Sequence, residues 1–112
     1  MSFTITHPLG RPPAFPELQE LAQEHDVQIN GNEQAGSFRH PQAEGNYAFE
    51  SGGIRGDFTS RVIGKLSGTF VFAAGKAEVT ITEKPFFVPE AVLKSKLSEE
   101  LEAFCAKFPP KA

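Results

Sequence analysis

The chain predicts an α+β fold in two layers, with an antiparallel sheet of about five to six strands against a long C-terminal and a short N-terminal helix. Apolar and polar residues alternate in several short runs, as in strands that bury one face. Near the C-terminus, leucine and phenylalanine recur at three- and four-residue spacing, as in an amphipathic helix. The order strand, helix, about four to five strands, helix favours a helix-grip-like arrangement of one domain over residues 1–112.

The N-terminal part predicts a strand and then a helix. Residues 3–6 alternate apolar side chains with threonine, and His7-Pro8 ends the strand. Pro16 suits a first helical turn, because its missing N–H would have no intrahelical partner. One side of the following helix of about ten residues would carry Leu18, Leu21, Ala22 and His25.

The middle of the chain predicts short strands at 27–30, 47–49 and 54–58, with turns at Gly31-Asn32 and Gly52-Gly53. Residues 33–46 are polar, and we expect loops there with at most a short edge strand around Phe38. Gly56 lies on the inward face of its strand, where a glycine allows a bulge or a close helix contact.

Two alternating runs, 66–72 and 77–81, predict a hairpin, which is the clearest strand signal in the chain. The side chains expected to face inward are Leu66, Phe70, Phe72, Ala77, Val79 and Ile81. Serine, threonine and glutamate occupy the alternate positions, so the other face of the sheet should be wet.

The last helix is expected from about Pro89 to Phe108, with Leu93, Leu97, Leu101, Phe104 and Phe108 in one apolar stripe. Phe86 and Phe87 precede it. These phenylalanines could plug the end of the core, or one could stay exposed beside part of the stripe as an apolar contact surface. The candidate hydrophobic contact residues are therefore Phe86, Phe87, Leu97, Leu101 and Phe104.

Composition argues against several classes of function. The net charge is −3 and the basic residues are scattered, which gives no footprint for nucleic acid. The N-terminus lacks the pattern of a secretory leader, and no apolar run is long enough to span a membrane. Cys105 is the single cysteine, so no intrachain disulfide can form, and we expect a reduced, cytoplasmic compartment.

The residues that could act in catalysis or bind a metal match no known pattern of an active or metal site, so we expect no enzyme, cofactor or metal site. The spacing of His7, His25 and His40 matches no zinc pattern. Arg55 and Asp57 share an outward strand face, with Glu50 across the hairpin; the three could bind a small anion or be ordinary surface polarity. Cys105 is expected to pack as a small hydrophobe.

The chain resembles the polyhydroxyalkanoic acid system family in several segments. These are residues 53–58, 66–71, 79–81, Pro85-Phe86 and the leucine-rich terminal helix. Residues 3–10, followed by a glutamate-rich helix, are similar to that family's start. Its members are small bacterial proteins whose genes lie near those for polyester storage granules. The resemblance implies an accessory role near a hydrophobic polymer and supplies no catalytic residues.

Three hypotheses follow for function. In the first, Phe86-Phe87 and the terminal helix contact a hydrophobic polymer, a lipid surface or a second copy of the chain. In the second, sheet and terminal helix enclose a cavity for a small apolar, acyl or lipid ligand. The residues expected to line that cavity are Phe49, Phe58, Phe70, Phe72 and Leu97. In the third, a sheet edge or helix pairs two copies into a homodimer.

Overall fold

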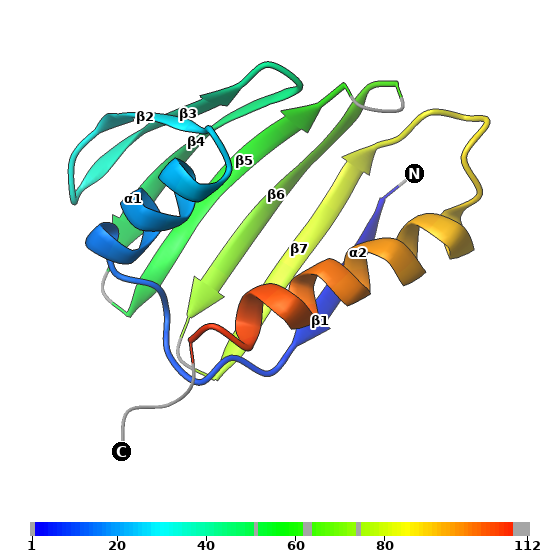
Figure 1. Cartoon of the computed structure of the whole chain (residues 1–112). Helices are drawn as coiled ribbons and strands as arrows, with labels where there is room; N and C mark the ends of the chain where they lie inside the picture. Colours follow the sequence, from blue (N-terminus) through cyan, green and yellow to red (C-terminus); the bar gives the residue numbers. More distant parts are fainter. Residues whose placement is uncertain (1, 51, 62–63, 74, 109–112) are drawn as a thin grey trace.

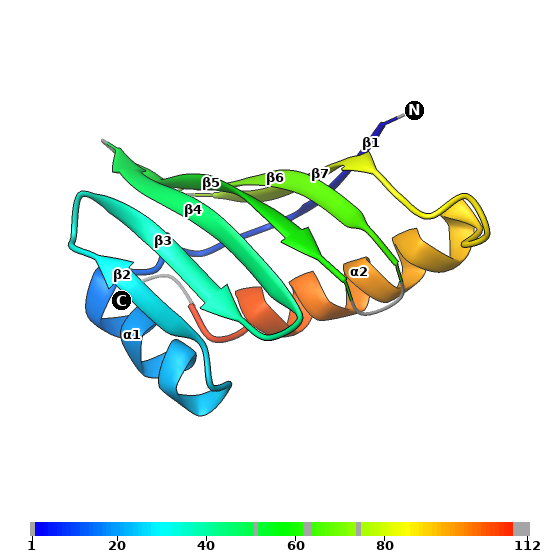
Figure 2. The same cartoon turned by 90° about the horizontal axis from the view of Figure 1, so that it is seen from above.

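The computed structural model describes residues 2–50, 52–61, 64–73 and 75–108 (Figure 1). It is a seven-stranded antiparallel sheet in the order β1-β7-β6-β5-β4-β3-β2, with two helices. The strands are β1 Phe3–His7, β2 Gln28–Gly31, β3 Ala35–His40, β4 Ala43–Glu50, β5 Gly53–Ser60, β6 Leu66–Ala73 and β7 Lys76–Glu83. The helices are α1 Phe15–Glu24 and α2 Glu90–Cys105, and both lie on the same side of the sheet (Figure 2). The α+β class with an antiparallel sheet and two helices is confirmed.

The predicted count of five to six strands is wrong, because residues 33–46 are not mainly loop. They hold all of β3 and the first half of β4, which pair in register over six positions. Glycine stands at inward positions of both strands, Gly36 in β3 and Gly45 in β4, so the apolar alternation that marks a strand is missing there. The pairing is visible only when the neighbouring strands are considered.

Helix α1 begins where the sequence predicts, with Pro16 in its first turn. The carboxylate of Glu17 accepts the N–H of Ala14 at 3.0 Å and both arms of the Arg11 guanidinium at 2.6 Å. Arg11 also lies over the Phe108 ring, 5.4 Å from its centroid. One side chain therefore joins the start of α1 to the segment just after α2.

Helix α2 buries only part of its apolar stripe. Leu93 and Leu101 are buried, as is Phe108 in the turn after the helix, whereas Leu97 and Phe104 remain half-buried. The core lies where α2 crosses β1 and β7, in two clusters of buried side chains. The first holds Ile5, Leu9, Ala77, Leu101, Cys105 and Phe108, and the second holds Leu66, Ile81 and Leu93. The compact core thus lies mainly at the β1–β7 end of the sheet, under α2. The central strands lie largely outside it.

All six side chains predicted to face inward on β6 and β7 do so: Leu66, Ala77 and Ile81 are buried, and Phe70, Phe72 and Val79 are half-buried. Among the described residues, no helix is long and apolar enough to cross a membrane.

Candidate functional site

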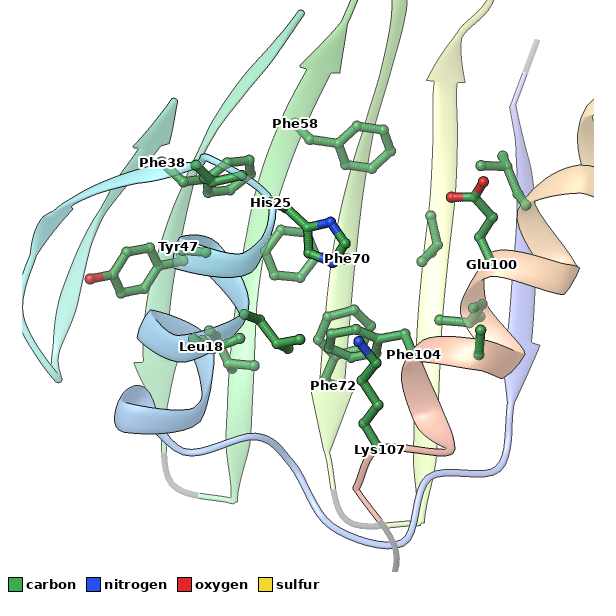
Figure 3. Close-up of a pocket in the computed structure, with 18 of the residues that line it drawn as sticks. Leu18, His25, Phe38, Tyr47, Phe58, Phe70, Phe72, Glu100, Phe104 and Lys107 are labelled. Atoms are coloured by element: carbon green, nitrogen blue, oxygen red, sulfur yellow. The ribbon is translucent and has the colours of Figure 1, made fainter. Parts of the chain in front are cut away.

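A groove of about 900 Å³ lies between α1 and α2, over the central strands of the sheet (Figure 3). Its floor is made by Phe38, Tyr47, Ile54, Phe58, Phe70, Phe72 and Val79. One wall comes from α1 and the residues after it, through Phe15, Leu18, Leu21, Ala22, Val27 and Ile29, and the other from α2, through Leu97, Leu101, Ala103 and Phe104. Charged and polar groups appear only at the rim, as His25, Lys96, Glu99, Glu100 and Lys107. The groove is therefore an apolar trough with a polar edge.

The floor is built from cross-strand pairs of one glycine and one aromatic residue. Six such pairs stand directly opposite each other in neighbouring strands: Gly36 with Tyr47, Phe38 with Gly45, Gly45 with Phe58, Tyr47 with Gly56, Gly56 with Phe70, and Phe58 with Gly68. Directly opposed residues of an antiparallel pair point to the same face. Each ring therefore has beside it a position without a side chain.

The rings use that space by lying along the sheet. A Cβ added to Gly56 would be 2.6 Å from Cζ of Phe70, and one added to Gly45 would be 2.5 Å from Cζ of Phe38. Because Cζ is the far end of the ring, these short distances place each ring flat over its glycine. Rings that stood upright would fill the space between the helices, so the glycines keep the groove open.

Aromatic contacts tie the floor to both helices. On the α1 side, the Phe15 ring is 6.3 Å from that of Tyr47, and on the α2 side the Phe72 and Phe104 rings are 4.9 Å apart. Phe70 stacks on Phe72 at 5.1 Å. Such contacts hold flat surfaces in place at both edges of the floor.

The single tyrosine supports the floor from its edge. Tyr47 is 6 % exposed, and its hydroxyl donates to the backbone oxygen of Asn32 at 2.9 Å. Burial raises the pKa of the Tyr47 phenol, because the charged phenolate would lose its hydration. The hydroxyl is thus already hydrogen-bonded within the protein, and the ring is the part of Tyr47 that lines the groove.

The structure separates the predicted contact residues into two groups. Leu97, Leu101 and Phe104 line the groove. Phe86 and Phe87 lie in the β7–α2 connection, 94 % and 65 % exposed, with their rings 5.8 Å apart and edge to face. The two phenylalanines therefore form a separate exposed pair and do not extend the groove.

The cavity expected between sheet and terminal helix has a wider outline in the structure. Phe58, Phe70, Phe72 and Leu97 line the groove, whereas Phe49 does not and instead contacts Phe15 and Tyr47. Sequence analysis missed the contribution of α1, because nothing local shows that this helix stands beside α2 with a gap between them. Glycines at strand positions opposite aromatics are the signal that could have indicated the floor.

The other chemical candidates stay apart. The Nδ1 of His7 is 2.8 Å from its neighbour's backbone oxygen, and His40 accepts a backbone N–H, while His25 stands at the groove rim. Arg55 pairs with Glu50 at 3.1 Å, whereas Asp57 bonds Asn46, so the three do not gather into one site. No group of three or more potential metal ligands occurs among the residues that are described.

Cys105, the last residue of α2, packs into the core as a small hydrophobe, as predicted. Burial raises the pKa of its thiol, which keeps the sulfur protonated near neutral pH.

Searches against known proteins find no family model, no curated protein and no solved structure that matches this chain. Its function is therefore inferred from its own groove and surfaces.

Proposed function

We propose that the groove between α1 and α2 binds a small apolar or amphiphilic molecule, such as a fatty acyl compound. The observation that carries this proposal is the floor of the groove, where the rings of Phe58, Phe70 and Phe72 stay only half-buried. Ligand pockets in proteins typically have volumes of about 300–1,000 Å³ and apolar linings with a few polar groups at defined places. The groove, at about 900 Å³ with polar groups only at its rim, has these properties.

The energetics favour an occupant. Each square ångström of apolar surface removed from water contributes roughly 25 cal/mol. A ligand lying on Phe58, Phe70 and Phe72 would cover ring faces that now meet solvent. Direct cross-strand pairs of glycine and aromatic residues fix the shape of the groove floor. The side chains of the floor should therefore need little rearrangement when a ligand binds.

Binding can be tested with Nile red, a neutral dye whose fluorescence rises in apolar surroundings. We expect dye fluorescence to rise with protein concentration and to fall when dodecanol competes. No dye binding, together with an unchanged melting temperature in dodecanol, would reject the proposal.

Two variants locate the binding. Leu18→Glu places a carboxylate in the α1 wall and should weaken dye binding. The matched control is Val71→Glu, because Val71 stands between Phe70 and Phe72 on β6 but points to the opposite face and is 44 % exposed. Equal loss of binding in both folded variants would place the dye outside the groove.

Contact with a hydrophobic polymer or lipid surface through Phe86 and Phe87 is a second candidate, favoured by their exposure. An adjacent pair of phenylalanines with most of its surface exposed is unusual for a surface that meets only water. The family resemblance suggests polyester granules as the surface. Sedimentation with granules should carry down the parent chain and leave a Phe86→Ser, Phe87→Ser variant in solution. Equal, negligible association of both proteins would remove this candidate.

A further inference from the structure

We infer that the ligand of the groove is a carboxylate amphiphile, with its acid group paired to Lys107 and its chain along the ring floor. The inference rests on the proposed function and adds the chemical class of the ligand. It follows from where the cations of the rim stand and from which of them already have a partner.

Lys107 is held at one end of the groove by the way α2 terminates. Its backbone N–H donates to Phe104 at 3.1 Å, and the next residue, Phe108, is 2 % exposed and donates to Cys105 at 3.1 Å. The buried neighbour anchors the turn, and the exposed Lys107 side chain extends into the opening between the helices (Figure 3). An ammonium group thus stands at the edge of an apolar trough, near the end of the floor where Phe104 of the α2 wall packs on Phe72.

The other rim charges are less suited to hold an anion. Lys96 is 3.8 Å from Glu100 on the next turn of α2, and Glu99 adds a second negative charge beside that pair. Lys107 forms no ion pair with any described residue. Glu17, Glu20 and Glu24 of α1 line a smaller pocket of about 230 Å³ together with Lys107, but none of these three described carboxylates forms an ion pair with it. Of the two lysines at the rim, Lys107 is therefore the one that can pair with a carboxylate entering the groove.

The floor gives the ligand a chain length. From Phe72 to Gly68, over which the Phe58 ring lies, β6 advances four residues, or about 13 Å. An extended chain advances about 1.2 Å per bond, so about eleven bonds would cover this distance. Dodecanoic acid is a suitable probe, with dodecanol as the neutral analogue that shares its chain.

The test compares the two probes by displacement of Nile red from the parent chain, Lys107→Gln, Lys107→Arg and Lys96→Gln. We expect dodecanoate to bind the parent about tenfold more tightly than dodecanol, because a charged hydrogen-bonded pair is added. Lys107→Gln should abolish this preference, and Lys107→Arg should retain it. Lys96→Gln, which changes the paired lysine of the same rim, should leave it intact. Thermal melts of each variant check that the fold is preserved.

Equal binding of acid and alcohol to the parent would overturn the assignment of Lys107 while leaving the apolar groove in place. The same conclusion would follow if Lys96→Gln, and not Lys107→Gln, removed the preference. Absence of binding by either probe or by the dye would remove the proposed function itself, so the two failures are distinguishable.

Discussion

Replacing Gly56 by alanine tests whether the ring floor depends on its glycines. The added Cβ would lie 2.0 Å from the backbone oxygen of Asn46 and 2.6 Å from Cζ of Phe70. Neither position is compatible with a real methyl group, so the β4–β5 pairing must shift and the ring must rise. Overpacking of this kind costs about 1–3 kcal/mol. Alanine returns about 0.4–1 kcal/mol by restricting the unfolded chain.

We therefore expect Gly56→Ala to lower the free energy of unfolding by about 1–2 kcal/mol, which corresponds to about 4–8 °C in melting temperature. Urea denaturation followed by circular dichroism measures the first quantity. The displaced Phe70 ring should also narrow the groove, so Nile red should bind the folded variant more weakly.

A double-mutant cycle with Phe70→Ala separates the ring from the backbone. Without the Phe70 ring, Gly56→Ala retains only the contact with Asn46, so its cost should fall by at least about 0.5 kcal/mol. A Gly56→Ala variant as stable as the parent, or strictly additive effects in the cycle, would show that the ring does not lie over this glycine.

Three further outcomes follow from burial. Leu101 is 6 % exposed, so Leu101→Ala should lower the free energy of unfolding in urea by about 2–5 kcal/mol. Phe86 is 94 % exposed, so Phe86→Ala should change the same free energy by less than about 0.5 kcal/mol. Similar values for both variants would contradict the assigned core. The pKa of Tyr47 is raised by burial, so the folded state holds its proton longer and stability should fall as pH rises above the ordinary value of 10.0. Tyrosinate absorbance should accordingly appear at higher pH in native than in urea-unfolded protein, and coincident titrations would refute this. Iodoacetamide should modify Cys105 slowly until urea unfolds the chain, and fast labelling of the native protein would contradict its burial.

The parts of the fold that sequence predicts well are those whose strands show their own alternation. The 66–81 hairpin is such a case, because most of its inward positions are large and apolar, with Gly68 and Ala77 as the small ones. Residues 33–46 fail the same test, since Gly36 and Gly45 occupy inward positions that rings from other strands cover. The information that makes β3 and β4 strands therefore lies in how the two strands pair with each other, and not in the alternation of either strand alone.

The candidate site was predicted in part for a similar reason. A cavity beside Phe70, Phe72 and Leu97 follows from the alternation of β6 and the stripe of α2. The wall from α1 does not, because the separation of two helices on one sheet depends on tertiary packing. The exposure of Phe86 and Phe87 was one of two alternatives that only the structure separates.

The most direct test of the groove is a nuclear magnetic resonance titration of the chain with dodecanol. If the groove is the binding site, resonances of Phe70, Phe72, Leu97 and Phe104 should shift together and saturate, while those of Phe86 and of Val71 on the opposite face stay in place. Shifts confined to Phe86 and Phe87, or no shifts at all when dodecanol is in excess, would contradict the account.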